Sequence, residues 1–284
     1  MAQDNFRSIL TGSFSTPCAG NPTVAMIESG FKAAGLDARY INCDVKPENL
    51  GDAVRGARAQ EWAGFNCSIP HKVAIIQHLD DLADSARLIG AVNCVKIESN
   101  GKLIGNNTDG QGFLASLKSV IEPAGKNVLL MGAGGAARAI AVELGLAKAA
   151  HISIYNVELA AAEEVAGIVN KNTSCKADAH LWTEDIKVPE GIDIVINATS
   201  IGFGDAEAIG KIDVSTLNKK HIVADVIPNP PNTKLLRSAA AQGCTTLHGL
   251  GMLVNQGKIG MNIFLGKELS ADVMTATLKD IFGA

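Results

Sequence analysis

Residues 127–146, NVLLMGAGGAARAIAVELGL, join a short apolar run to a long alanine-rich segment through a glycine-rich turn. This order predicts a strand, a tight turn and a helix. The turn, GAGGAA at 132–137, matches the G-x-G-x-x-G/A pattern that places a dinucleotide pyrophosphate at a helix N-terminus. In this context the pattern predicts a Rossmann-type βα unit, and so a parallel α/β sheet. A glycine-rich turn without a ligand is the alternative.

The small residues of the turn have distinct expected roles. Gly132 allows the tight turn, Gly134 lets the backbone approach the pyrophosphate, and Ala137 lets the helix pack close to the strand. The residues that we predict to bind the cofactor are Gly132, Gly134, Gly135, Ala136, Asn156, Glu158 and Thr199.

The end of the next predicted strand bears on the choice of cofactor. It reads Asn156-Val157-Glu158, and no Arg or Lys follows before Lys171. An Arg there accommodates the 2′-phosphate of NADP, whereas a carboxylate favours the free ribose hydroxyl of NAD. We therefore expect NAD or NADP, with NAD favoured. The alternative is that Glu158 only starts a helix, where a carboxylate is favourable in any case.

Strand-like and helix-like segments alternate along the chain, which predicts an α/β protein with parallel sheets covered by helices on both faces. The expected strands are 8–14, 38–45, 64–69, 91–98, 127–133, 151–156, 193–199, 222–227 and 245–249. The expected helices are 22–35, 47–59, 110–121, 135–147, 158–170, 232–242, 251–265 and 271–281.

The pattern also predicts two domains. A new βα series begins after PAGKN at 123–127, and the last two expected helices have no strand after them. We expect residues 1–112 and 250–284 to form an α/β substrate domain completed by C-terminal helices. Residues 113–249 then form an inserted Rossmann domain.

Composition narrows the range of partners. The net charge is −4 and no Lys/Arg cluster is present, which argues against a nucleic-acid partner. No apolar run reaches the ~18 residues of a membrane helix, and the N-terminus does not resemble a signal peptide. The six cysteines form no C-x-x-C pair, so we expect reduced thiols, no metal site and a cytoplasmic protein.

Polar side chains stand where apolar runs end, which is where ligands bind in α/β sheets. They are Asn66, Ser68, Lys72, Asn93, Asn107, Thr108, Asp109 and Gln256. Converging amides and hydroxyls predict a pocket for a polyhydroxylated small molecule, because buried polar groups without partners cost about 1–3 kcal/mol each.

Lys72 and Asp109 are the predicted catalytic pair. Hydride transfer between an alcohol and NAD(P) needs a group that takes or gives the hydroxyl proton, and a partly buried lysine tuned by a carboxylate serves this purpose. A structural ion pair is the alternative.

Together these stretches resemble the shikimate dehydrogenase family. The matching motifs, spread from residue 64 to 257, are NCSIPHK, GAVN, NNTDGQGF, GAGGAARAI, NATSIGF and GMLVNQG. The resemblance implies a two-domain enzyme that interconverts 3-dehydroshikimate and shikimate, or oxidises quinate. It also implies that Lys72 and Asp109 are catalytic. Substrate contacts are implied for Asn66, Ser68, Asn93 and Gln256.

Two departures from the family concern substrate recognition. Where the family has the serine pair S-x-S-P that holds the substrate carboxylate, this chain has Asn21 and Thr23, and Glu28 stands near them. Pro228 replaces a tyrosine. Asn21 and Thr23 are therefore predicted substrate residues with altered shape.

Three alternatives remain open at this stage. The substrate is shikimate, quinate or a related cyclic polyol acid, or the chain is a paralogue with a different substrate. A biosynthetic, NADP-linked enzyme and a non-catalytic dinucleotide sensor are the other two. We expect a monomer or a homodimer.

Overall fold

The computed structural model describes residues 6–283, which form two compact units. Of the described residues, unit 1 comprises 6–108 and 257–283, and unit 2 comprises 109–256. The predicted domain boundaries fall within seven residues of these divisions, at 112/113 and 249/250. Among the described residues, no helix has both the length and the apolar character needed to cross a membrane.

Unit 1 is built on a six-stranded mixed sheet with the order β2-β1-β3-β5-β6-β4. Strands β1, β2 and β3 run parallel, whereas β5 is antiparallel to both β3 and β6. The strands are β1 Ile9–Ser15, β2 Ala38–Asp44, β3 Gly64–Cys67, β4 Asp81–Leu82, β5 Cys94–Ile97 and β6 Leu103–Asn106.

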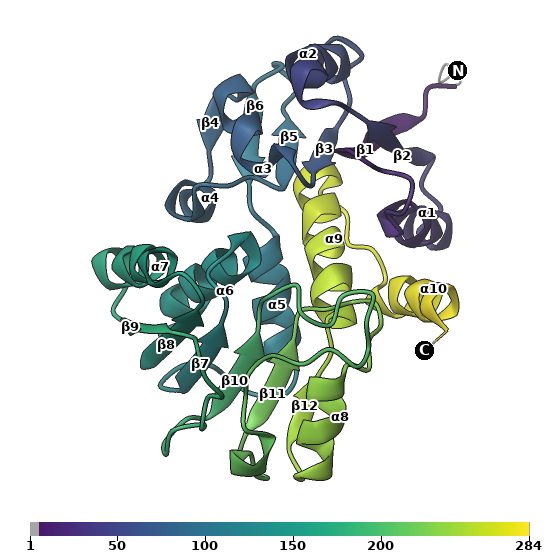
Figure 1. The fold of residues 1–284 in the computed structure, drawn as a ribbon. Coiled ribbons are helices and arrows are strands. Elements are labelled where there is room, and N and C mark those ends of the chain that lie inside the picture. The colour runs from purple at the N-terminus through teal and green to yellow at the C-terminus, as the bar shows by residue number, and fades with distance from the viewer. Residues whose placement is uncertain (1–5, 284) are drawn as a thin grey trace. The chain divides into compact units, whose positions relative to one another are not determined.

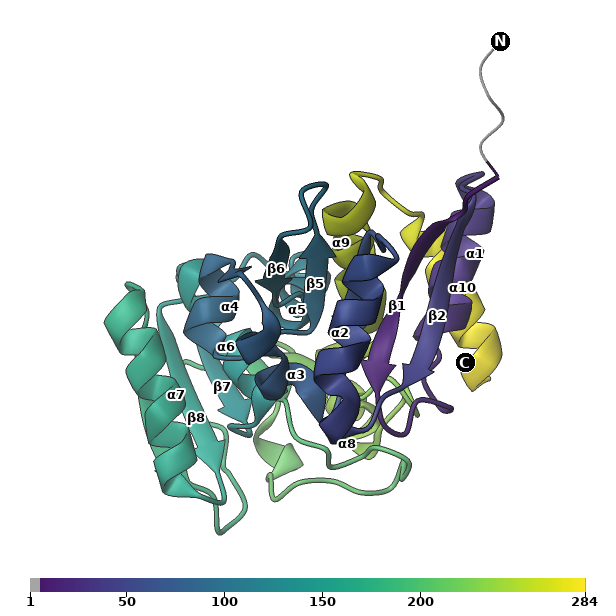
Figure 2. The same cartoon turned by 90° about the horizontal axis from the view of Figure 1, so that it is seen from above.

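Helices cover both faces of this sheet (Figure 2). Phe14 and Phe65 face α2, where they pack with Leu50 and Val54 in one apolar cluster. On the opposite face α1 packs against α10. The helices of unit 1 are α1 Thr23–Ala33, α2 Leu50–Ala59, α3 His71–Ala74, α4 Asp84–Ile89 and α10 Ala271–Phe282, with short 3₁₀ turns η1 Pro47–Asn49 and η2 Ile75–His78.

Unit 2 contains a six-stranded, all-parallel sheet with the order β12-β11-β10-β7-β8-β9 (Figure 1). Its strands are β7 Asn127–Met131, β8 His151–Asn156, β9 Lys176–Leu181, β10 Ile194–Asn197, β11 Ile222–Asp225 and β12 Thr245–Leu247. Its helices are α5 Asp109–Leu117, α6 Gly135–Leu146, α7 Leu159–Asn172, α8 Lys234–Ala241 and the start of α9 Leu250–Leu265, with the 3₁₀ turn η3 Val214–Thr216.

The central strand of unit 2 shows why its sequence is apolar without a break. In β7, Val128 and Leu130 belong to the apolar cluster that contains residues of α6 and α7. Leu129 and Met131 belong to the cluster on the other face, with residues of α8. A parallel strand covered by helices on both faces needs apolar side chains in both directions.

The α/β fold class and the two-sheet architecture are as predicted. The expectation of purely parallel sheets is wrong for unit 1, since Asn66 pairs with Cys94 in antiparallel register. The sequence pattern also missed β4, β6, β9, α3 and α4. Strands and helices this short have too little periodicity to be distinguished from loops.

Candidate active site

The predicted substrate residues of unit 1 lie where its parallel strands end. The register places Ser13 of β1 between Asn42 of β2 and Asn66 of β3. Ser68 follows the end of β3, and its N–H donates to the Phe14 carbonyl at 3.0 Å. The carboxyl ends of β1, β2 and β3 thus present a continuous row of polar groups.

A chain of hydrogen bonds runs through this row. The hydroxyl of Tyr40 donates to Oδ1 of Asn66 at 2.9 Å, and Nδ2 of Asn66 donates to the Asn93 carbonyl at 3.0 Å. Asn93 in turn accepts from the backbone N–H of Thr108 at 2.7 Å and donates to its hydroxyl at 3.1 Å. Burial raises the pKa of Tyr40 above its ordinary value, so the phenol keeps its proton and remains a donor. The two predicted residues Asn66 and Asn93 are therefore fixed in orientation.

A second network holds the segment in which the family has its serine pair. Ser13 donates through Oγ to Oδ1 of Asn42 at 2.9 Å, and Nδ2 of Asn42 donates to the Asn21 carbonyl at 2.9 Å. Nδ2 of Asn21 approaches Oγ of Ser13 at 3.4 Å, and Oδ1 of Asn21 accepts from the N–H of Thr23 at 3.0 Å. The Asn21 amide is thus engaged within the protein, where it anchors the start of α1.

Two hydroxyls at this edge remain available to a ligand. Within residues 6–283, neither the Thr23 nor the Ser68 hydroxyl has a hydrogen-bond partner. Thr23 is 7% exposed and Ser68 is half-buried, so both lie at the margin of the polar row. Each hydroxyl can donate or accept, and this suits the hydroxyl and carbonyl groups of a small polyol.

The departure at Glu28 has a local explanation. Its carboxylate accepts a short hydrogen bond from the backbone N–H of Tyr40, so it joins α1 to the edge strand β2. The charge is therefore engaged by the backbone of β2.

The predicted catalytic residues come from two segments. Lys72 is the second residue of α3, which begins directly after the cis Ile69–Pro70 bond, and the Lys72 carbonyl accepts from the N–H of Val92 at 2.7 Å. Asp109 is the first residue of α5 and of unit 2, and it follows Thr108, which Asn93 holds. The segment of Val92 and Asn93 thus contacts both Lys72 and the residue before Asp109.

Gln256 lies in α9 at the end of unit 2. Its Nε2 donates to the Leu253 carbonyl at 3.0 Å, and it is 8% exposed.

The glycine turn of unit 2 has the geometry expected of a dinucleotide site. Gly132 has φ 107°, and a Cβ there would lie 2.9 Å from the Ala198 carbonyl oxygen, so a side chain is excluded. Gly134 precedes α6, and a Cβ on Gly134 or Gly135 would meet nothing within 4 Å. A helix N-terminus that follows a glycine turn without side chains is the arrangement in which N–H groups, here the first of them on Gly135 and Ala136, bind the phosphates of a dinucleotide.

The other predicted cofactor residues lie at the carboxyl ends of β8 and β10, the two strands that flank β7 in the same sheet. Asn156 ends β8 and donates to the Glu158 carbonyl at 3.0 Å, and Glu158 is the exposed residue before α7. Thr199 follows β10, and its Cγ2 would lie 3.1 Å from a Cβ at Gly132. Thr199 therefore adjoins the glycine turn.

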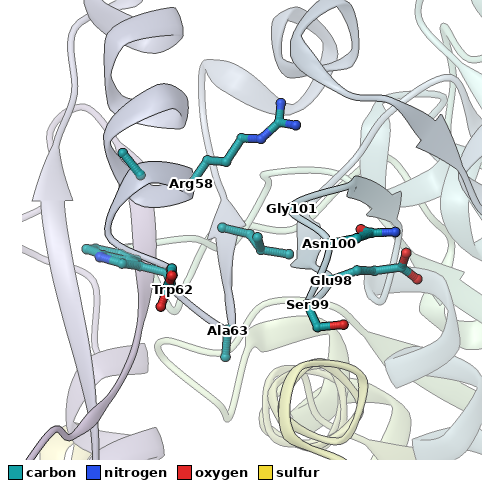
Figure 3. Close-up of a pocket in the computed structure, with 10 residues that line it drawn as sticks. Arg58, Trp62, Ala63, Glu98, Ser99, Asn100 and Gly101 are labelled. Carbon is teal, nitrogen blue, oxygen red and sulfur yellow. The ribbon is translucent and has the colours of Figure 1, made fainter.

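A cavity in unit 1 stands apart from these residues (Figure 3). It is about 590 Å³, and its lining includes Arg58, Trp62, Glu98 and Asn100. It lies at the Gly64 end of β3, whereas Ser68 and Lys72 follow the other end of that strand. Figure 3 shows the Trp62 ring turned away from the residues of the β5–β6 hairpin. Because this cavity lies at the opposite end of β3 from Ser68 and Lys72, it is not part of the candidate active site.

Comparison with known proteins identifies the family to which this chain belongs. Residues 16–95 match the model of the shikimate dehydrogenase substrate binding domain. A shikimate dehydrogenase (NADP(+)) of Alkaliphilus metalliredigens is 38% identical over 268 residues, which cover 92% of both chains. The chain belongs to the shikimate dehydrogenase family. It is accordingly an NAD(P)-dependent oxidoreductase that acts on a CH–OH group.

Two solved structures that resemble this chain are of enzymes named for different substrates. A ligand-free 5-ketofructose reductase of Gluconobacter sp. strain CHM43 is 63% identical, with a TM-score of 0.96 over 98% of this chain and 100% of that one. A shikimate 5-dehydrogenase from Listeria monocytogenes, in complex with shikimate and NAD, is 35% identical, with a TM-score of 0.89 over 98% of this chain and 99% of that one.

Sequence reasoning missed Ser13, Tyr40 and Asn42. Tyr40 and Asn42 are two residues apart in β2, so they point to one face of the sheet, and Ser13 is the partner of Asn42 in the register. The alternation of polar residues in the predicted strands at 8–14 and 38–45 is the signal that could have found them.

Proposed function

We propose that this protein reduces a neutral polyhydroxylated ketone of the 5-ketofructose type to the corresponding secondary alcohol, with NAD(P)H as the hydride donor. The observation that carries the proposal is its 63% identity to a 5-ketofructose reductase over almost the whole of both chains. Identity to the shikimate dehydrogenases that match it is far lower, at 38% for the Alkaliphilus enzyme and 35% for the Listeria enzyme.

The geometry at the start of α1 supports a substrate without a carboxylate. The family pattern has two serine hydroxyls there. In this chain Asn21 directs its amide to Ser13 and to the Thr23 N–H, which leaves the hydroxyl of Thr23 as the free donor. A carboxylate would lose one of two charge-assisted hydrogen bonds, each worth about 1.5–3 kcal/mol. A ketose, which has only hydroxyl and carbonyl groups at that end, loses much less.

The predicted substrate-binding and catalytic residues have distinct proposed roles. The hydroxyls of Thr23 and Ser68 bind substrate hydroxyls, and the oriented amide of Asn66 supplies a further hydrogen bond. Gln256 is a further proposed substrate contact. Lys72 and Asp109 are the proton donor and the carboxylate that tunes it.

Lys72 would give the proton that completes the alcohol, and a bound NAD(P)H would supply the hydride for the new C–H bond. The phosphates of that dinucleotide would be held by Gly132, Gly134, Gly135 and Ala136, and Thr199 adjoins Gly132. We assign substrate binding to the domain formed by both ends of the chain and cofactor binding to the inserted domain.

Glu158 is the basis of the predicted preference for NAD. It is exposed two residues after the end of β8, where its charge would oppose a 2′-phosphate. The Alkaliphilus relative is named for NADP(+) and the Listeria structure contains NAD. We propose NAD as the preferred cofactor of this chain, and direct comparison of the two cofactors tests it.

Shikimate is the second candidate substrate, favoured by the Alkaliphilus relative's name and by the retained motifs around Asn66, Lys72 and Asp109. Steady-state assays separate the two. Purified protein is given 5-ketofructose with NADH or NADPH, and shikimate or quinate with NAD or NADP, and the absorbance of the reduced cofactor is followed. Higher kcat/KM with 5-ketofructose supports the proposal. Turnover of shikimate or quinate alone refutes it, and turnover of none refutes both candidates.

A variant tests the hydroxyl assigned to substrate binding. Thr23→Val should raise KM for the substrate far more than it lowers kcat, because the hydroxyl binds the substrate but takes no part in proton transfer. The matched control is Thr277→Val in α10, whose hydroxyl donates to Ser29 within unit 1 at 2.9 Å. Equal losses in KM and kcat at Thr23, or a KM increase in the control, would contradict this role.

A further inference from the structure

A buried carboxylate in unit 2 has no place in the proton-transfer chemistry. Asp225, the last residue of β11, is 2% exposed. Within the described residues no Lys, Arg or His forms an ion pair with it, and burial raises its pKa above the ordinary value. Burying a carboxylate costs free energy unless hydrogen bonds or a counter-charge compensate for the lost hydration.

Its three hydrogen bonds join three segments. Oδ1 of Asp225 accepts from Nδ2 of Asn197 at 3.0 Å and from the N–H of Ile227 at 3.1 Å. Oδ2 accepts from the hydroxyl of Thr233 at 2.8 Å. The carboxylate therefore links the end of β10, the segment after β11 and the start of α8.

The Asn197 bond fixes which way that amide points. A carboxylate only accepts, so it must face the NH₂ group of Asn197, and the amide oxygen must face the other side. There Oδ1 of Asn197 accepts from the hydroxyl of Thr199 at 2.7 Å and from its N–H at 3.2 Å. Nδ2 also donates to the Ile201 carbonyl at 3.1 Å, and the Ile201 N–H donates to the Thr199 hydroxyl at 3.1 Å. All four hydrogen-bonding positions of the Asn197 amide are used.

The far end of this chain of contacts reaches the cofactor site. Thr199 adjoins Gly132, and the carbonyl of Ala198 closes the space where a side chain at Gly132 would lie. The position of the 198–201 turn against the glycine turn thus depends on the orientation of Asn197. That orientation depends on Asp225.

We propose that Asp225 is a positioning residue for the dinucleotide, acting through Asn197 to hold Thr199 against the glycine turn. The proposal concerns the NAD(P) site that the chain has as a family member, and it is independent of which substrate the enzyme reduces.

The test is Asp225→Asn, which keeps the shape of the side chain but allows it to present NH₂ or C=O to Asn197. The dissociation constant is measured with NADH and with NADPH by fluorescence titration, without substrate. We expect it to rise about tenfold, the equivalent of one hydrogen bond of ~1.4 kcal/mol. In the steady state, KM for the dinucleotide should rise more than kcat falls.

Two controls separate positioning from stability. Asp213→Asn makes the same change in unit 2 at a carboxylate that caps η3 through Ser215 and has no contact with Asn197. Thr233→Val removes another partner of Asp225 and the side-chain cap of α8. Both should lower the melting temperature without changing dinucleotide affinity.

Asn197→Ala removes the other partner of the Asn197–Asp225 hydrogen bond, and it is the test variant if Asp225→Asn does not fold. A tenfold weaker affinity in either folded variant, but not in the controls, supports the proposal. Unchanged affinity in a folded Asp225→Asn or Asn197→Ala protein overturns it, as does an equal loss in Asp213→Asn or Thr233→Val.

Discussion

The hydroxyl of Tyr40 offers the sharpest test of how the substrate edge is built. It donates to Oδ1 of Asn66 at 2.9 Å, Tyr40 is 2% exposed and Asn66 is 9% exposed. Tyr40→Phe deletes only the hydroxyl and leaves a buried amide oxygen without a donor, at a cost of about 1–3 kcal/mol. We expect the free energy of unfolding of unit 1 to fall by ~1–2 kcal/mol.

The same deletion should change substrate binding. Without the phenol, the Asn66 amide loses the bond that fixes its orientation, although Nδ2 keeps its bond to the Asn93 carbonyl. We expect KM for the substrate to rise about tenfold, which corresponds to ~1.4 kcal/mol. Dinucleotide affinity should not change, because every residue of this network lies in unit 1.

The chain supplies both the probe and the control. Its two tryptophans divide between the units, so in a Trp182→Phe background the fluorescence of Trp62 during urea unfolding reports unit 1. Tyr155 is the other tyrosine, and within the described residues its hydroxyl makes no hydrogen bond. Tyr155→Phe should therefore leave stability and KM unchanged. Wild-type stability and KM in Tyr40→Phe, or the same losses in Tyr155→Phe, would refute the reasoning.

Three further predictions concern catalysis, cofactor choice and pH. Lys72→Ala should lower kcat by ~10²–10⁴ with dinucleotide affinity near that of the wild type, and near-normal kcat would exclude it as the proton donor. Glu158→Arg should raise kcat/KM with NADP(H) relative to NAD(H), and an unchanged ratio would mean that position 158 does not face the ribose. Burial, aided by Lys220 and opposed by Asp193, lowers the pKa of His221 below 6.5. The stability that the neutral ring contributes is present above pH 6.5 and is lost as the pH falls through the lowered pKa, with a slope of at most ~1.4 kcal/mol per pH unit. Urea unfolding between pH 7 and 5 should show this slope in the wild type but not in His221→Gln, and identical slopes would contradict it.

Local sequence patterns predicted the parts of the fold that are determined by residues close together in the sequence. The predicted strand, turn and helix at 127–146 are β7, the glycine turn and α6. The residues that determine this structure, Gly132 with its positive φ and the apolar residues on both faces of β7, all lie within the segment. The antiparallel placement of β5 was not predictable, because strand direction depends on how the chain returns to the sheet.

The role of Asn21 shows a second limit. Its position in the chain identifies it as the counterpart of a carboxylate-binding serine, but its contacts are with Ser13 on β1 and Asn42 on β2. Sequence spacing gives no information on such contacts between distant segments. The same holds for Tyr40 and Asn66, which are 26 residues apart.

The ratio of kcat/KM for 5-ketofructose to that for shikimate, each with its better cofactor and in one protein preparation, tests the central claim most directly. We expect a ratio of about tenfold to a hundredfold, since loss of one charge-assisted hydrogen bond of about 1.5–3 kcal/mol to the shikimate carboxylate corresponds to that range. A ratio below one would contradict the proposal and would mean that Thr23 and Asn21 bind a carboxylate as the serine pair of the family does.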